Sequence, residues 1–103
     1  MKLPESTLIA PEKLSRYLME EYKFELFHRV ALARDFPEKH LRRGDVATIV
    51  DRHPAPDDGE PGYSLEVFNA IGETIDVIIV AESELQELHA DEVLSARPLA
   101  IAA

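Results

Sequence analysis

The sequence predicts a mainly β fold: a small SH3-like barrel of four to five antiparallel strands with an N-terminal helical extension. Short β-rich stretches alternate with Pro- and Gly-containing turn signals. The chain of 103 residues is long enough for one domain and not for two. Four or five strands in about 75 residues suit such a barrel better than an immunoglobulin sandwich, which needs more strands. We therefore expect a helical extension over residues 1–23, the barrel over 24–99 and a frayed tail over 100–103.

The N-terminal extension is predicted to hold a short helix. Pro11 suits the first helical position, where its missing N–H costs nothing. An apolar stripe at helical spacing follows it, formed by Leu14, Tyr17, Leu18 and Tyr22. A helix of about three turns is only marginally stable by itself. The stripe is therefore expected to dock, either on the barrel of the same chain or on another subunit.

Two strands are predicted in the first half of the barrel. A period-two pattern over residues 24–33 predicts the first strand and places His28 in its apolar phase, as a half-buried histidine. A long polar loop over residues 35–45 follows, with Gly44 for a turn of positive φ. The β-branched run over residues 46–50 predicts the second strand.

The second half is predicted to contain a hairpin. A loop with three Pro and two Gly over residues 53–62 precedes a third strand over residues 63–68. A tight turn over residues 69–72 leads into a fourth strand over 73–81. Residues 83–88 could form a helical turn, and a last short strand could lie within 87–94 or 93–97.

The fourth strand carries apolar residues on both of its faces. Ile75, Val77 and Ile79 alternate on one face, with Ile78 and Val80 on the other. Strands of this kind are usually covered on both sides. The covering layer could be the N-terminal helix, a second copy of the chain or a different protein.

Charge is distributed unevenly along the chain. The net charge is −9; residues 1–44 carry a balance of +2, and residues 45–103 carry −11, with Arg52 and Arg97 as their only Lys or Arg. A negative field repels phosphate backbones and anionic lipid and attracts basic surfaces. The simpler explanation of this negative charge is that it keeps the protein soluble. The negative field disfavours nucleic-acid binding, and only a local patch of Lys39, Arg42 and Arg43 could support it.

The sequence lacks the residues or spacings that several classes of chemistry require. The absence of cysteine excludes disulfides, thiolate metal sites and a cysteine nucleophile. No two of the four histidines have the spacing of a helical metal-binding pair, and no serine lies in a nucleophile elbow. No glycine pattern for nucleotide phosphates is present. We therefore expect no enzyme activity, no metal and no cofactor. Without an apolar membrane span or a signal-peptide pattern, a cytoplasmic location is expected.

A long part of the chain resembles a known family. The carrying stretches are residues 28–32, 41–50, 63–68, 72–74 and 85–88, and the most specific is the Leu-x-x-Gly-Asp-x-x-Thr-x-Val run that begins at Leu41. Through them, residues 24–97 resemble a bacterial family of domains of unknown function, the one numbered 4926. The chain has His28 where the family usually has Asp, and Ala47 where it usually has Gly. The same run resembles the KOW-type loop of small barrels, which implies binding to RNA or to a ribosomal protein.

The start of the chain resembles a second family. Residues 3–18, from Leu3-Pro4 through Pro11 to Tyr17-Leu18, are similar to the opening of the family of unknown function numbered 6883. Members of the two families are often encoded side by side, which is typical of toxin–antitoxin and effector–immunity pairs. The resemblance implies that this chain is the small acidic partner of such a pair. Neither family brings known catalytic residues.

The expected function is therefore a non-enzymatic protein-interaction module of antitoxin or immunity type, which occludes a basic surface of a cognate protein. The expected acidic binding residues are Asp51, Asp57, Asp58, Glu60, Glu66, Glu73 and Asp76. Apolar anchors are expected from Leu14, Tyr17 and Leu18 of the helix stripe, or from the fourth strand. One alternative is a KOW-like accessory that binds RNA or a ribosomal protein through Lys39, Arg42 and Arg43. Another is a homodimeric structural module.

Overall fold

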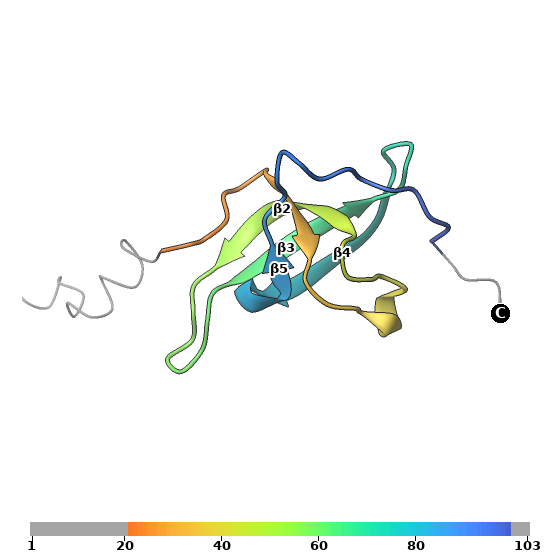
Figure 1. Cartoon of the computed structure of the whole chain (residues 1–103). Coiled ribbons are helices and arrows are strands. Elements are labelled where there is room, and N and C mark those ends of the chain that lie inside the picture. Colours follow the sequence, from red (N-terminus) through yellow and green to blue (C-terminus); the bar gives the residue numbers. More distant parts are fainter. Residues whose placement is uncertain (1–20, 100–103) are drawn as a thin grey trace, which may run out of the picture.

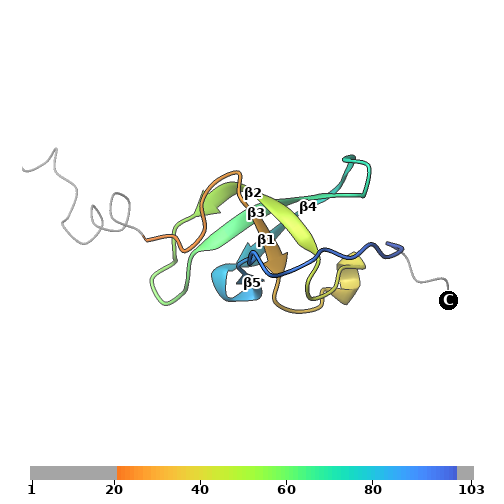
Figure 2. The ribbon, with the colours of Figure 1, turned by 45° about the horizontal axis from the view of Figure 1, so that its top comes forward.

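The structure is a computed structural model that describes residues 21–99, and it contains one five-stranded sheet (Figure 1). The strands are β1 (Arg29–Leu32), β2 (Val46–His53), β3 (Gly62–Phe68), β4 (Thr74–Ala81) and β5 (Leu85–Gln86). Their order is β4-β3-β2-β1-β5, and every pairing is antiparallel. The sheet curls on itself into a half-barrel (Figure 2). The predicted mainly β fold of up to five antiparallel strands is confirmed.

The predicted N-terminal helix lies almost entirely outside the described residues, as does the predicted frayed tail at residues 100–103. Residues 21–23, the described end of the predicted helical extension, are not helical. Among residues 21–99, no helix is long and apolar enough to cross a membrane.

The concave side of the half-barrel holds the core. Ile49, Tyr63 and Leu65 are completely inaccessible to solvent, and Ile78 and Val80 of β4 pack on the same side. These residues alternate with exposed or half-buried ones along β3 and β4, as the period-two pattern predicts. β4 therefore places Ile78 and Val80 in the core and leaves Val77 and Ile79 on the outside.

Two turns require glycine. Gly44 has φ of +91° immediately before Asp45 and β2, and Gly72 has φ of +86° at the end of the β3–β4 turn. The Asn69 side chain organises the second turn, since its Oδ1 accepts hydrogen bonds from the N–H groups of Ile71 and Glu73 at 3.1 and 2.9 Å. Both predicted turns are confirmed.

The first strand is shorter than predicted. It begins at Arg29, because the chain turns at Phe27, whose φ is +65° and whose N–H donates to the C=O of Ile49 at 2.6 Å. The prediction of a half-buried His28 is wrong, because this turn carries the imidazole into solvent. There His28 lies 3.3 Å from the carboxylate of Glu25.

The loop over residues 35–45 is polar, as predicted, yet it contributes to the core. Pro37 opens a short 3₁₀ turn, η2 (Pro37–Lys39), and Phe36 pairs with Leu41 across its base. Both apolar side chains are buried. The Arg34 guanidinium stacks 3.7 Å from the centre of the Phe36 ring.

The C-terminal end of the sheet also differs from the prediction. A 3₁₀ turn, η3 (Glu82–Glu84), follows β4, and β5 then pairs with β1. No strand forms within residues 87–97. β5 has only two residues, and its pairing with β1 joins positions that are more than 50 residues apart in the chain, as in Ala31↔Gln86. A pairing between such distant positions leaves no signal in the local sequence pattern.

Candidate functional site

The convex side of β2, β3 and β4 combines carboxylates with exposed apolar side chains. Because directly paired residues on neighbouring strands point to the same side of a sheet, two rows of side chains cross this surface. They are Thr48–Glu66–Val77 and Asp51–Ser64–Ile79. Leu65, between the two central positions of these rows, points into the core.

Three exposed apolar side chains flank the Glu66 carboxylate. The exposed fractions are 40% for Phe68, 57% for Val77 and 73% for Ile79. Phe68 lies two residues beyond Glu66 on β3 and therefore on the same side. We call Asp51, Glu66, Phe68, Val77 and Ile79 together the acidic–apolar face. Its exposed branched and aromatic groups are typical of a surface that binds another protein.

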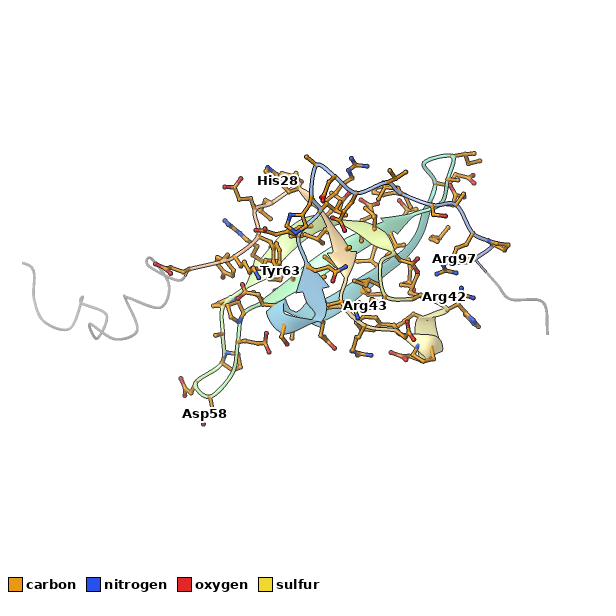
Figure 3. The ribbon with its side chains drawn as sticks, in the orientation of Figure 1. His28, Arg42, Arg43, Asp58, Tyr63 and Arg97 are labelled. Atoms are coloured by element: carbon orange, nitrogen blue, oxygen red, sulfur yellow. The ribbon has the colours of Figure 1, made fainter. Side chains whose placement is uncertain are left out.

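The other predicted acidic residues do not lie on this face. Asp57 and Asp58 are exposed in the β2–β3 loop, and Asp58 lies at its far tip, away from the sheet (Figure 3). Glu60 of the same loop is held by Ser83, whose N–H and hydroxyl donate to its carboxylate at 2.5 and 2.8 Å. These three carboxylates belong to the β2–β3 loop, whereas Glu66 lies within β3.

Two further carboxylates serve the hairpin itself. Glu73 accepts a hydrogen bond from the Asn69 amide at 2.8 Å at the end of the turn. Asp76 is half-buried on β4, and its Oδ1 accepts the N–H of Val77 at 2.8 Å. Of the seven carboxylates predicted to bind a partner, only Asp51 and Glu66 lie on the acidic–apolar face.

A bulge changes the faces of β4. The register shifts between Val67 and Phe68, which pair with Asp76 and Thr74 and leave Ile75 as the extra residue. Ile75 lines an open groove of about 460 Å³ that also includes Val67 and part of the C-terminal segment. The bulge therefore interrupts the predicted alternation at Ile75, whereas Val77 and Ile79 share one face as predicted.

The predicted helix anchors Leu14, Tyr17 and Leu18 lie outside the described residues. The described chain enters the fold beside Tyr63. Tyr22 packs edge-on against the Tyr63 ring at 6.0 Å, and Phe24 does so at 5.6 Å. The Tyr63 hydroxyl accepts the N–H of Phe24 at 3.2 Å and donates to Glu82 at 2.6 Å. Burial, foremost, and this bond to Glu82 raise the pKa of Tyr63 to about 12.

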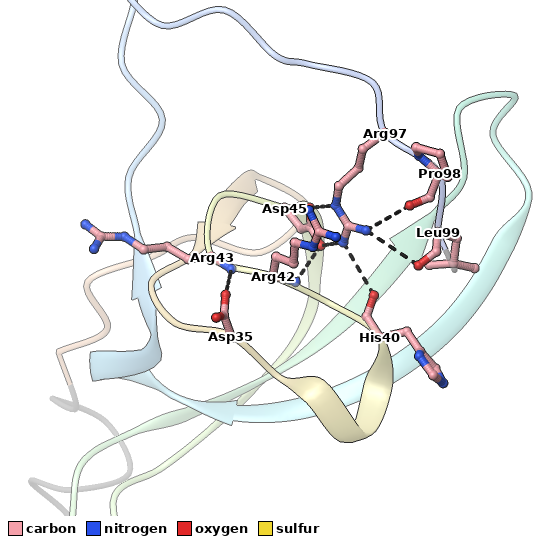
Figure 4. Close-up of polar contacts among 8 residues, drawn as sticks. All are labelled: Asp35, His40, Arg42, Arg43, Asp45, Arg97, Pro98 and Leu99. Atoms are coloured by element: carbon pink, nitrogen blue, oxygen red, sulfur yellow. Dashed lines mark hydrogen bonds and ion pairs between the residues drawn. The ribbon is translucent and has the colours of Figure 1, made fainter. Parts of the chain in front are cut away.

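The basic residues of the alternative RNA-binding hypothesis are exposed, as that hypothesis requires. They lie on and after η2 and are Lys39, Arg42 and Arg43. Their loop is fixed through backbone groups, since the N–H of Arg42 donates to Asp45 at 2.7 Å and that of Arg43 to Asp35 at 2.9 Å (Figure 4). Among the described residues, the guanidinium groups of Arg42 and Arg43 form no ion pair, so both remain accessible to a ligand.

Arg97 clamps the C-terminal segment to this loop. Its guanidinium forms a two-point ion pair with Asp45, with Nε at 3.0 Å from Oδ1, and it also donates to the C=O of His40 at 3.4 Å (Figure 4). The bonds to Asp45 raise the pKa of Arg97 above its ordinary value. Arg97 is one of the two basic residues within residues 45–103, and its charge is thus paired with a carboxylate of the same chain.

A metal ion within residues 21–99 would require several histidine or carboxylate side chains arranged around one point. No group of three or more histidine, aspartate or glutamate side chains is arranged to hold a metal ion there. A ring nitrogen of His53 lies at hydrogen-bond distance, 2.8 Å, from the hydroxyl of Ser64.

Sequence reasoning missed two features. The Arg97–Asp45 clamp joins residues 52 apart, and only the isolation of Arg97 in an acidic half hinted at a partner. Phe68 lies in the predicted third strand but is not among the residues predicted to bind a partner. The structure shows that it is exposed beside Glu66, whereas Tyr63 of the same strand is fully buried.

A family model matches residues 26–87, and its description is "Domain of unknown function (DUF4926)". The match covers β1 to β5 and therefore all of the sheet. No curated protein and no solved structure matches the chain.

Proposed function

This chain belongs to the DUF4926 family, and we propose that it is a non-enzymatic, acidic interaction module of antitoxin or immunity type. In this proposal it acts in the cytoplasm and occludes a basic surface of a cognate protein. The observation that carries the proposal is the acidic–apolar face, where exposed Phe68, Val77 and Ile79 flank the carboxylate of Glu66.

The two components of this face would have different roles. The exposed aromatic and aliphatic groups supply most of the affinity when they are buried by a partner. The carboxylates of Asp51 and Glu66, with the negative field of the second half of the chain, select a basic surface and accelerate encounter. A partner that covers this face would have Lys or Arg around an apolar centre.

The fold supports the same proposal. We assign the half-barrel to the SH3-like class, extending over residues 24–99, because five short antiparallel strands curl around one core. Domains of this size have little room for a deep catalytic cleft in addition to their core. Binding through the convex side of the sheet leaves that core intact.

The test begins with capture of the partner from a native lysate under nuclease treatment, followed by purification of the pair and measurement of its Kd. Glu66→Lys should weaken binding by about tenfold or more, since it places a like charge at a desolvated interface. Glu38→Lys, an equal charge change on η2, is the matched control and should leave the Kd unchanged. Equal affinity of Glu66→Lys and the natural chain would contradict the proposal.

A second candidate is the KOW-like accessory that binds RNA or a ribosomal protein. It is favoured by the accessible guanidinium groups of Arg42 and Arg43 beside Lys39. The double variant Arg42→Glu/Arg43→Glu would abolish this activity and leave binding through Glu66 nearly intact. Loss of the captured material on nuclease treatment would favour this candidate. A homodimer with no other partner, revealed by sedimentation, would favour a structural module.

A further inference from the structure

The outer edge of β4 is an unpaired strand edge. β4 is the last strand of the sheet order and pairs only with β3 among the described strands. The opposite edge of the sheet, β5, has two residues and is too short to pair with another strand over any length. β4 has eight residues.

Three hydrogen bonds identify which backbone groups point to the open edge. The N–H of Val77 binds the Asp76 side chain, and the N–H of Ala81 binds that of Glu84, so neither points at β3. The N–H of Glu82 does point toward the side of β3, since it binds the C=O of Pro61, the residue that precedes β3, at 2.9 Å. Because this direction alternates along an antiparallel strand, the N–H and C=O of Ile79 also point outward.

The same residues expose apolar side chains. Val77 and Ile79 have their backbone groups at the open edge and their side chains on the acidic–apolar face. An added strand could therefore form main-chain hydrogen bonds to both residues. In the same register its side chains would cover Val77 and Ile79, which have larger exposed fractions than Phe68 and Ile75.

Charge decides which strand can be added. Residues 53–96 contain eleven Asp or Glu and no Lys or Arg. Natural sheets commonly protect an open edge with Lys or Pro, and β4 has neither. Asp76 instead lies beside the edge and occupies the N–H of Val77. A second copy of β4 would bring a second Asp76 into this field, whereas a basic strand would neutralise it.

We propose that the open edge of β4 accepts an extended basic segment of the partner as a sixth, paired strand. This inference rests on the proposed function and specifies how the partner binds. The segment alternates apolar residues, which lie beside Val77 and Ile79, with Lys or Arg, which face Asp76 and the surrounding field. The N–H of Val77 exchanges its bond to Asp76 for one to the added strand.

The test uses the full chain and a defined probe, the capped heptapeptide Lys-Val-Lys-Val-Lys-Val-Lys. Amide hydrogen exchange at Ile79 should slow by about tenfold when the peptide is present at about ten times its Kd. The corresponding Glu-Val heptapeptide should leave this exchange rate unchanged. Absence of slowing at Ile79 with the basic peptide would overturn the proposal.

Two methylated peptides isolate the backbone contribution. In the proposed register the N–H groups of the valines face β4 and those of the lysines face solvent, because side chain and backbone direction alternate together. Methylation of the three valine nitrogens should abolish the protection of Ile79. Methylation of three lysine backbone nitrogens should preserve it. Equal behaviour of the two methylated peptides would overturn strand pairing.

Two variants of the protein make the same comparison. Ile79→Pro removes the outward N–H and no bond to β3, and Ile79→Ala removes the side chain and keeps that N–H. Ile79→Pro should bind the peptide much more weakly than Ile79→Ala, with circular dichroism to establish that both fold. If both variants bind equally, and Glu66→Lys weakens both, strand pairing fails and the acidic–apolar face stands. If Glu66→Lys has no effect on partner binding, the proposed function fails as well.

Discussion

Tyr63 joins the entry of the described chain to the end of β4 through its hydroxyl. That oxygen receives the N–H of Phe24 and donates to Glu82, and Glu82 also accepts the N–H of Lys23 at 3.0 Å. Tyr63→Phe leaves the buried N–H of Phe24 without an acceptor, so the free energy of unfolding should fall by about 1–3 kcal/mol. Urea denaturation measures it. An unchanged midpoint would show that the hydroxyl contributes nothing to stability.

The pKa of the same hydroxyl predicts the alkaline limit of the fold. It is raised from 10.0 to about 12 in the folded protein, first by burial and then by the bond to Glu82. Unfolded chain releases this proton at lower pH than folded chain, so the stabilisation is complete below pH 10 and is lost as pH rises toward about 12. A spectrophotometric titration should show Tyr63 ionising together with unfolding. Ionisation of all described tyrosines near pH 10 in folded protein would contradict it.

Glu84 contributes to stability on the acid side. Partial burial tends to raise its pKa, but the hydrogen bond from Ala81 and the ion pair with Arg34 at 2.6 Å outweigh burial and lower it below 4.5. The resulting stabilisation is complete above pH 4.5 and is lost as pH falls through the lowered pKa. Glu84→Gln should therefore flatten the acid limb of unfolding free energy against pH. The exposed Glu87→Gln is the control and should retain the full slope.

At the scale of an element, the turn before β2 depends on one glycine. Gly44 has φ of +91°, and no atom lies within 4 Å of the position that a Cβ would occupy. Gly44→Ala should therefore cost about 1–2 kcal/mol through backbone strain alone. Gly44→Asn should cost less, because asparagine adopts positive φ more readily. Thermal unfolding of the two variants compares them, and equal losses would point to a cause other than φ.

The strands differ in how well local patterns predict them. β2, β3 and β4 follow from β-branched runs and period-two alternation between clear turns, and their predicted positions agree with the structure to within a few residues. β1 and β5 do not, because β1 is cut short by the turn at Phe27 and β5 is defined by its pairing with β1 alone. Such long-range pairings have no local signal.

At the scale of the whole molecule, the charge asymmetry predicts how association depends on salt. The second half of the chain carries −11, and the acidic–apolar face belongs to it. Raising the salt concentration from about 50 to 500 mM should therefore reduce the association rate with a basic partner by about tenfold or more. The dissociation rate should change much less, because desolvated apolar contacts govern it. Stopped-flow kinetics measure both rates, and an association rate independent of salt would rule out electrostatic steering.

The sequence by itself determined the class of fold, the central strands, the turns at Gly44 and Gly72 and the acidic second half. These properties are local or additive, since propensity, alternation and charge are read position by position. The absence of cysteine also excludes disulfides and thiolate chemistry from the sequence alone. The sequence names the seven carboxylates expected to bind a partner, but it does not give their arrangement in space.

Only the tertiary structure decided which of those carboxylates lie together. Asp51 and Glu66 share a face because the registers of β2, β3 and β4 bring them there, while Glu60 lies in the β2–β3 loop and Asp76 pairs with the core residue Val67. The bulge at Ile75 and the open edge at Ile79 likewise depend on strand register. Register is fixed by packing of the whole core, and one shifted residue reverses every side chain beyond it.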